Sequence, residues 1–269
     1  MMSITINDLL KINYDKIINI ICKETKSIIS DAKVKGVVVG LSGGIDSTVT
    51  AYLMVKALGK DKVLGLIMPY RTTPKEDIED ALEIARGLGI KYYYIDIVNI
   101  RDAFAKSLPD FDENDKVSSG NLLPRIRMTI LYYYANKYNL LVAGTGDKSE
   151  LLLGYFTKYG DGGVDFLPIG DLYKTQVRYL GKVLEIPEKI VNKPSSPRLW
   201  TGHLAEVELG LKYEVIDLIL YTIFDLGMSI NEASRKTGID IEIFEMILSK
   251  VRSTEHKRSL PKIIRISNI

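Results

Sequence analysis

Residues 40–47 carry the side chains best suited to chemistry. Glycines let a phosphate group approach the backbone closely, and serine hydroxyls can donate hydrogen bonds to it. The P-loop pattern is absent, because no lysine follows the glycines. A carboxylate facing a polyphosphate needs a divalent cation between the two, usually Mg²⁺. This segment, predicted to bind phosphates, consists of Gly40, Leu41, Ser42, Gly43, Gly44, Ile45, Asp46 and Ser47.

The neighbouring sequence predicts how this segment is held. Residues 36–39 are a glycine and three valines, which suit a strand buried on both faces. Val49, Leu53 and Ala57 then recur at the spacing of a helix packed on a sheet. The glycines therefore lie between a strand and a helix N-terminus, where the helix dipole favours an anion. A glycine-rich turn without a ligand is the alternative, but strand, turn and helix together favour the phosphate site.

The order of the predicted elements indicates an α/β fold. Strands alternate with helices, which favours a parallel, doubly wound sheet of about five strands with helices on both faces. Ligands bind such sheets beyond the carboxyl ends of the strands. We expect strands at 36–39, 63–68, 91–97 and 140–144 with a possible short one at 164–169, and helices at 75–88, 99–107 and 122–138.

The flanking segments show no domain boundary, so residues 1–269 are predicted to form one domain. An amphipathic helix is expected over 7–29 at the N-terminal end. Two further segments are expected to be loops: 109–120, over the site or at a subunit surface, and 193–205, as a lid. The remaining helices, which end in a C-terminal helical segment, are predicted at 173–184, 211–226, 229–236 and 240–250.

Composition excludes several classes of protein. A net charge of +2 gives no argument for nucleic acid or a membrane as a partner. One cysteine, Cys22, excludes an internal disulfide and fits a reducing compartment. No apolar stretch has the length of a membrane span. We therefore expect a cytoplasmic enzyme.

A second group of polar residues follows the fourth predicted strand. Thr145 and Glu150 are expected at the same edge of the sheet as Asp46. Two carboxylates approaching a triphosphate from neighbouring strand ends could share one or two Mg²⁺ ions. Considered alone, Glu150 is more often an ordinary solvated residue of a first helical turn, favoured by the helix dipole.

Several motifs resemble known families. The Ser-Gly-Gly-x-Asp-Ser loop at 42–47 resembles that of N-type ATP pyrophosphatases, which cleave ATP between the α- and β-phosphates. Residues 144–150 and 154–163 are similar to the signature of NAD synthetases, as are 120–128 and the Thr-Glu-His-Lys-Arg motif at 254–258. The resemblance covers about residues 7–262 and is closest to the ammonia-dependent form. It implies an adenine nucleotide alpha-hydrolase-like fold.

The resemblance also implies a reaction, substrates and a quaternary structure. The carboxylate of nicotinic acid adenine dinucleotide (deamido-NAD) would attack the α-phosphorus of ATP and form an adenylated acyl intermediate, which ammonia converts to NAD and AMP. Mg²⁺ would be the metal and ATP a co-substrate. The family forms homodimers in which the substrate site borrows from the second subunit.

Family roles carry over to matching positions of this sequence. The implied metal ligands are Asp46 and Glu150, which with Lys158 form the implied catalytic group. Further implied ATP contacts beyond residues 40–47 are Thr145, Lys174 and Ser196. The implied contacts to deamido-NAD are Arg125, Lys158, Asp165, His256 and Lys257. Without the resemblance, Arg125, Lys174 and the basic segment 252–258 would be interpreted as solvated, and His203 as structural or exposed.

Two departures and several alternatives remain. Pro197 follows Ser196, and Ala205 stands where an aspartate is common in the family, which puts lid contacts in doubt. A glutamine-dependent relative would need about 200 further residues for an amidotransferase domain, so free ammonia or a separate partner is the expected nitrogen source. The alternatives are another N-type ATP pyrophosphatase and an ATP-binding sensor without turnover. A tRNA-modifying enzyme should be more basic than this chain.

Overall fold

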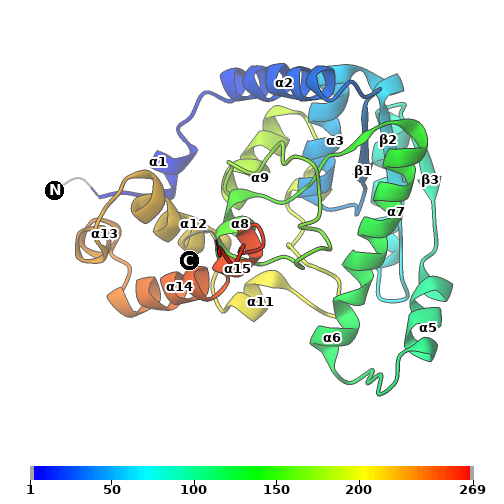
Figure 1. Cartoon of the computed structure of the whole chain (residues 1–269). Helices are drawn as coiled ribbons and strands as arrows, with labels where there is room; N and C mark the ends of the chain where they lie inside the picture. Colours follow the sequence, from blue (N-terminus) through cyan, green and yellow to red (C-terminus); the bar gives the residue numbers. More distant parts are fainter. Residues whose placement is uncertain (1–2, 267–269) are drawn as a thin grey trace.

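A four-stranded parallel sheet lies to one side of a helical layer in the computed structural model, which describes residues 3–266 (Figure 1). The strands lie in the order β3-β2-β1-β4, and Val37 of β1 pairs with Val63 of β2 and Leu141 of β4. The order places β1 between two neighbours, so the residues that follow it emerge at the middle of the carboxyl edge. The strands are β1 (Val37–Gly40), β2 (Val63–Ile67), β3 (Lys91–Tyr94) and β4 (Leu141–Val142).

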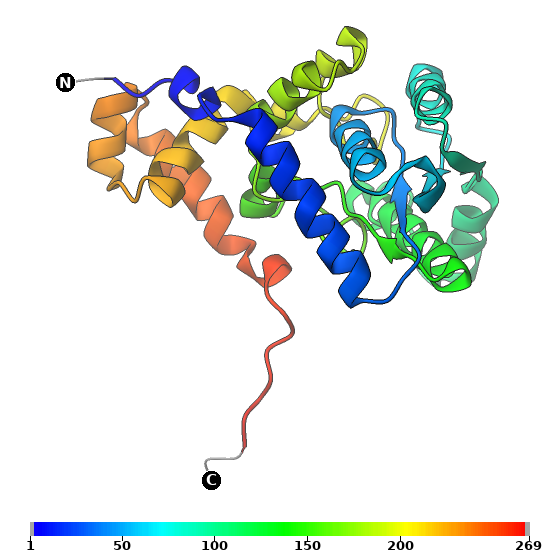
Figure 2. The ribbon, with the colours of Figure 1, turned by 90° about the horizontal axis from the view of Figure 1, so that it is seen from above.

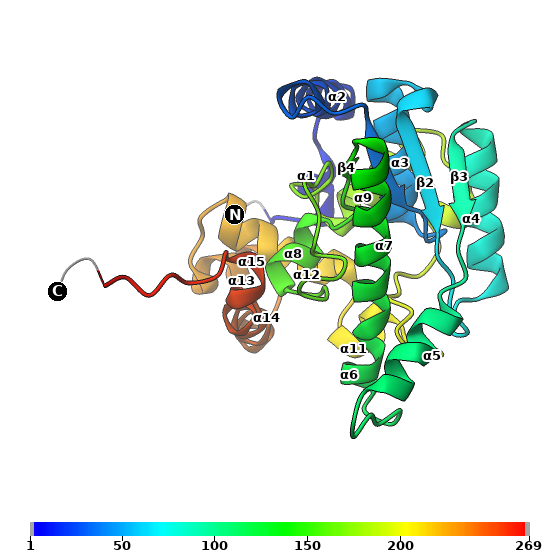
Figure 3. The ribbon, with the colours of Figure 1, turned by 45° about the vertical axis from the view of Figure 1, so that its right-hand side comes forward.

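Helices cover both faces of the sheet, as predicted. Val37 and Val39 of β1 pack into one core and Val38 into another, because successive side chains of a strand point to opposite faces. Figure 1 and Figure 2 show α2 running across α3, and Figure 3 shows α7 in front of the other face. The first core contains α2 (Tyr14–Asp31), α3 (Ile45–Leu58), α4 (Lys75–Gly87) and α9 (Lys174–Val183), and the second contains α5 (Val98–Ser107) and α7 (Leu122–Tyr138).

A third core lies beside the sheet and is built almost entirely from helices. Leu153, Ile216 and Phe244 are fully buried in it. Tyr173, directly before α9, joins this core, so the helical layer is attached to the helix that packs on the sheet. Its helices are α1 (Ile6–Leu10), α8 (Lys148–Leu153), α11 (Ala205–Leu209), α12 (Tyr213–Leu220), α13 (Ile230–Thr237) and α14 (Ile241–Ser253).

The prediction of about five strands was wrong by one. Residues 164–169 form only a single bridge, between Phe166 and Ala143. The backbone N–H of Val142 donates to the Asp165 carboxylate at 2.7 Å. The acceptor is therefore a side chain, whereas a neighbouring strand would offer a main-chain carbonyl. Pro168 has no N–H to continue a ladder. The segment therefore lies beside β4 without forming a strand.

Three predicted helical or loop segments also differ. The helix expected over 7–29 is interrupted, because the Asn13 side chain accepts from Lys16 N at 2.9 Å and starts α2 afresh. The loop expected over 109–120 ends in α6 (Lys116–Gly120), capped by Asp115. The helix expected over 211–226 finishes in a π-helical turn. Further short elements are η1 (Lys60–Lys62), α10 (Glu188–Val191), the π turn η2 (Tyr221–Asp225) and α15 (Glu255–Arg258).

None of the helices within residues 3–266 combines the length and apolar character that crossing a membrane requires.

Candidate active site

Residues 40–47 span the last residue of β1, the turn at 41–44 and the first residues of α3, as the sequence predicted. The hydroxyl oxygens of Ser42 and Ser47 lie 3.0 Å apart, and Ser47 Oγ donates to the carbonyl of Gly44 at 3.1 Å. Because α3 begins at Ile45, its first N–H groups lie at the carboxyl edge of the sheet. This phosphate turn (residues 40–47) thus has the form of an anion site.

Packing against α4 requires glycine at position 43. Gly43 has φ +75°, and a Cβ there would lie 2.1 Å from the carbonyl oxygen of Asp77 in α4. At Gly44 the nearest atom to a built Cβ is Ser42 Oγ at 3.4 Å, an ordinary contact. Close packing of α4 therefore explains Gly43, whereas open space remains beside Gly44.

Three carboxylates meet beside the phosphate turn. One oxygen from each of Asp46, Asp147 and Glu150 lies within 4.8 Å of the others. Asp147 caps α8, since its side chain accepts from Glu150 N at 2.8 Å. The prediction that Asp46 and Glu150 approach each other from two strand ends is confirmed, and Asp147 is an addition to it.

Lys174 lies at the centre of these three residues (Asp46, Asp147 and Glu150, the carboxylate group). Its Nζ is 2.6 Å from Asp46, 2.9 Å from Asp147 and 2.8 Å from Glu150, and its side chain is fully buried. Burial raises the pKa of Glu150 well above its usual value, and the Lys174 ammonium opposes that rise. Burial would lower the pKa of Lys174, but the three carboxylates together raise it, so the lysine stays charged.

Asp217 of α12 contacts residues adjacent to the carboxylate group and to Lys174. It accepts hydrogen bonds from Ser149 Oγ at 2.5 Å and from the backbone N–H of Thr175 at 2.8 Å. Ser149 precedes Glu150, and Thr175 follows Lys174. Asp217 is fully buried, and burial raises its pKa to about 7. Through these two hydrogen bonds, Asp217 connects α12 to α8 and α9 at the residues next to Glu150 and Lys174.

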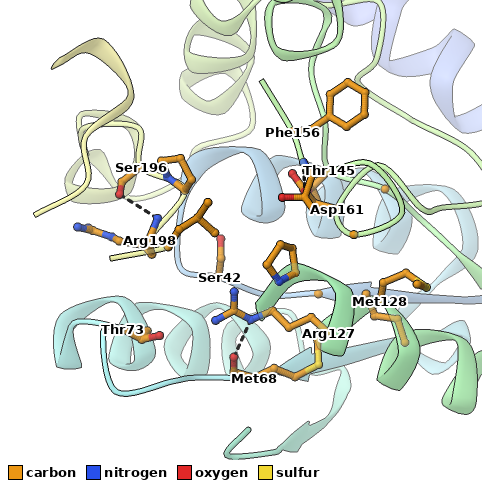
Figure 4. A pocket seen from close by; sticks show the side chains of 18 of the residues that line it. Ser42, Met68, Thr73, Arg127, Met128, Thr145, Phe156, Asp161, Ser196 and Arg198 are labelled. Carbon is orange, nitrogen blue, oxygen red and sulfur yellow. Dashed lines mark hydrogen bonds between the residues drawn. The ribbon is translucent and has the colours of Figure 1, made fainter. Parts of the chain in front are cut away.

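A cavity of about 370 Å³ opens at the same edge of the sheet. Figure 4 shows Ser42 near its centre, with Ser196 and Arg198 on one side and Met128 on the other. Most of the predicted site residues are not among the described lining residues; those outside the lining are Gly43, Gly44, Ile45, Asp46, Ser47, Arg125, Glu150, Lys158, Asp165, Lys174 and His256. The predicted residues that line the cavity are Gly40, Leu41, Ser42, Thr145, Ser196 and Lys257.

The predicted substrate-binding cations gather around the glycine-rich loop (residues 157–163). Arg125 approaches the carbonyl of Lys158 at 3.4 Å, and Lys158 Nζ donates to the carbonyl of His256 at 2.7 Å. Lys257 Nζ donates to the carbonyls of Gly154 and Phe156 at 2.7 and 2.9 Å. Segments that lie far apart in the sequence therefore meet at the glycine-rich loop, part of which lines the cavity together with Lys257.

Asp165 takes a different position. Its carboxylate accepts from Val142 N and, at 3.1 Å, from Tyr132 Oη. It is not among the described residues that line the cavity. The structure therefore places Asp165 against β4, and its substrate contact stays a prediction.

Arg127 and Asp161 are cavity residues to which the sequence interpretation gave no role. Arg127 Nε donates to the carbonyl of Met68 at 3.0 Å, and burial lowers its pKa to about 10. Asp161 accepts from Thr157 N at 2.8 Å, and its enclosure by protein raises its pKa. Both residues lie within the motifs that resemble NAD synthetases. Their position in those motifs is the sequence signal that could have identified them as site residues.

His203 is buried in the late loop (residues 193–205), so an exposed position was wrong. Its ring stacks on Trp200 with centroids 3.5 Å apart, and its Nε2 lies 2.6 Å from Glu208 Oε2. Ser196 Oγ donates to its carbonyl. All four residues line the cavity. A histidine stacked on the sole tryptophan organises this loop.

Comparison with known proteins points to one family. The sequence model of the family described as NAD synthase matches residues 17–261. The NH₃-dependent NAD⁺ synthetase of Staphylothermus marinus is 55% identical over 263 residues, covering 97% of this chain and 95% of that protein.

Solved structures agree. NMN synthetase from Francisella tularensis is 35% identical with a TM-score of 0.84, covering 95% of this chain and all of that chain. NH₃-dependent NAD synthetase from Campylobacter jejuni is 34% identical with a TM-score of 0.80, covering 94% of this chain and all of that one.

Proposed function

Because the chain belongs to the NAD synthase family, we propose that it amidates deamido-NAD with ammonia, using ATP, to give NAD. One observation of the structure supports this best. The phosphate turn and the carboxylate group share one edge of the sheet with a cavity whose lining includes the basic residues Arg127, Arg198 and Lys257. A nucleoside triphosphate and a second, anionic substrate could therefore bind next to each other at this edge of the sheet.

The chemistry explains why ATP is needed. A carboxylate is a poor acyl donor until one of its oxygens becomes part of a good leaving group. Attack of the nicotinate carboxylate on the α-phosphorus expels pyrophosphate and forms an acyl adenylate. Ammonia then attacks the carbonyl carbon, expels AMP, loses a proton and leaves the amide. No protein nucleophile is required, so positioning and charge stabilisation are the protein's contribution.

The phosphate turn is proposed to hold the ATP phosphates. Backbone N–H groups at the start of α3 and the hydroxyls of Ser42 and Ser47 can donate to phosphate oxygens. Thr145 and Ser196 line the cavity on either side and are proposed to contact the rest of ATP. Lys174 carries the positive charge beside this site. Such binding would fit the adenine nucleotide alpha-hydrolase-like fold that the sequence resemblance implies.

The carboxylate group suits Mg²⁺. Asp46 Oδ1 is buried and has no hydrogen-bond partner, which is an open position for a ligand. Three carboxylates and one ammonium leave a formal charge of −2 when all are ionised. Carboxylate oxygens are ligands that Mg²⁺ prefers. Asp46 and Glu150 would hold the ion, and the ion when bound would neutralise phosphate charge.

The other end of the cavity is proposed to bind deamido-NAD. Arg125, Lys158, His256 and Lys257 offer cationic and imidazole donors to its phosphates. Lys158, on the glycine-rich loop, is the one we place closest to the reaction. Asp165 is proposed to bind hydroxyls of the substrate or the incoming amine. Because Asp165 lies against β4 and does not line the cavity, this contact would have to form outside the cavity. A homodimer whose second subunit completes the site would provide such a contact.

NMN synthesis is a second candidate, because the solved NMN synthetase shares this fold at a TM-score of 0.84. The dinucleotide is favoured by curated relatives of near-equal length that are named NAD⁺ synthetases. Another ATP pyrophosphatase and an ATP-binding sensor are the remaining alternatives to exclude.

One assay separates these candidates. The purified protein, with ATP, Mg²⁺ and ammonium chloride, is given either deamido-NAD or nicotinic acid mononucleotide, and NAD and NMN are quantified. We expect NAD to form with ammonium as the only nitrogen source. A higher kcat/KM for the mononucleotide would favour NMN synthesis, and no product with either substrate would contradict the proposal.

A further inference from the structure

A buried lysine at the start of the late loop reaches the phosphate turn. Lys193 Nζ lies 3.1 Å from the carbonyl oxygen of Gly43 and 2.9 Å from Asp77 Oδ1, and it also donates to Asp80 Oδ2. Its side chain is only 10% exposed. One ammonium thus connects the late loop, α4 and the phosphate turn.

The two carboxylates around Lys193 keep it charged and in place. Burial would lower the pKa of Lys193, but its hydrogen bonds with Asp80 and Asp77 raise it above its usual value. Each carboxylate has a second cation as well. Arg198 Nε donates to Asp77 at 2.8 Å, and Lys189 Nζ lies 2.7 Å from Asp80. Because the largely buried charges of Lys193, Asp77 and Asp80 are paired, the ammonium can be held at a fixed point.

The hydrogen bond to Gly43 has a geometric consequence. In a planar trans peptide, the C=O of one residue and the N–H of the next point in opposite directions. Fixing the Gly43 carbonyl toward α4 therefore directs the Gly44 N–H away from α4. That N–H donates to Ser42 Oγ at 3.3 Å, and Ser42 lines the cavity. Glycine at φ +75° has little intrinsic preference for this orientation, so an outside contact must hold it.

We propose that Lys193 is a positioning residue for ATP: through the Gly43 carbonyl it holds the Gly43–Gly44 peptide so that the Gly44 N–H and the Ser42 hydroxyl face the phosphates. This inference rests on the proposed binding of ATP at the phosphate turn. It also links ATP binding to the late loop, because Lys193 begins the segment that carries Ser196 and Arg198.

Lys193→Met tests the role, with Lys189→Met as the matched control. Both lysines pair with Asp80, but only Lys193 contacts Gly43. In Lys193→Met each carboxylate retains one cation, Arg198 or Lys189, which limits the loss of stability. If that variant does not fold, Lys193→Leu replaces it in the test, because leucine also lacks a donor for the Gly43 carbonyl.

The readout is the dissociation constant of MgATP by calorimetry, together with KM for each substrate. We expect Lys193→Met to weaken ATP binding by about tenfold or more. KM for deamido-NAD should change far less. Amide hydrogen exchange over residues 41–47 should become faster in Lys193→Met and stay unchanged in Lys189→Met.

Equal ATP affinity in the two variants, or an equal rise in both KM values, would overturn the positioning role. The calorimetric measurement does not depend on turnover. Wild-type protein that binds ATP but forms no NAD would therefore count against the proposed reaction and leave this test intact.

Discussion

The phosphate turn and the glycine-rich loop border the same cavity but are held in different ways. The turn follows a strand whose three valines are fully buried, and the hydrogen bonds of its serines stay within residues 42–47. The glycine-rich loop and the residues before it are held by distant segments. Arg125 approaches the loop from 33 residues earlier, and Lys257 reaches the carbonyl of Phe156 from 101 residues later. In the proposed ATP half, the serine hydrogen bonds of the phosphate turn are thus local, although Lys193 also reaches the turn from the late loop, whereas the proposed substrate half is assembled mainly from remote parts.

This difference predicts how each half responds to substitution. Changes at the carboxylate group should abolish catalysis without loosening the substrate half. Changes among the remote contacts should weaken substrate binding and leave ATP binding intact.

The largest effect is expected at Asp46. Asp46→Asn removes the carboxylate that carries the unpartnered oxygen, and we expect NAD formation to fall by about 1,000-fold or more at saturating substrates. The measurement is the steady-state rate as a function of Mg²⁺ concentration. Asp61→Asn, at an exposed acid in η1, is the control. A variant with near-normal rates would mean that the carboxylate group is only structural.

An intermediate effect is expected from Asp217, which supports the carboxylate group. Its folded pKa of about 7 lies above the usual 3.8, so the folded protein holds this proton more tightly than the unfolded chain does. That contribution to stability is complete below about pH 4 and is lost as the pH rises through about 7.

Asp217→Asn has no such proton to lose. Between pH 5 and pH 8 its free energy of unfolding should therefore fall less than that of the wild type, by on the order of 2–3 kcal/mol. Urea denaturation at several pH values measures this difference. Identical pH slopes for the two proteins would show that Asp217 is not the titrating group.

The smallest effect is expected in the substrate half. Lys257→Met removes two hydrogen bonds to backbone carbonyls beside the glycine-rich loop. We expect KM for deamido-NAD to rise by about tenfold, with KM for ATP nearly unchanged. Lys262→Met, in the exposed segment beyond α15, serves as the control. A parallel rise in both KM values would remove the distinction between the two halves.

The sequence predicted the local half well for physical reasons. A buried valine strand, a glycine turn and an apolar helix face each have their own pattern, and together they placed the phosphate turn between β1 and α3. The meeting of Asp46 and Glu150 followed from the rule that parallel strands end at one edge.

The remainder depended on contacts that no local pattern encodes. Lys174 resembles a surface lysine in sequence, yet three carboxylates from two other helix starts enclose it. The Asp165 carboxylate takes the place of a strand acceptor, which removed the fifth strand. Asn13 starts a new helix within a continuous apolar pattern, because a side-chain cap competes locally with helix continuation.

Product analysis tests the central claim most directly. Wild-type protein is incubated with ATP, deamido-NAD, Mg²⁺ and ammonium, and the adenine nucleotides and NAD are separated and quantified. If the phosphate turn presents the α-phosphorus for attack, AMP and NAD must appear in equal amounts with pyrophosphate. Formation of ADP and phosphate in proportion to NAD would contradict the account.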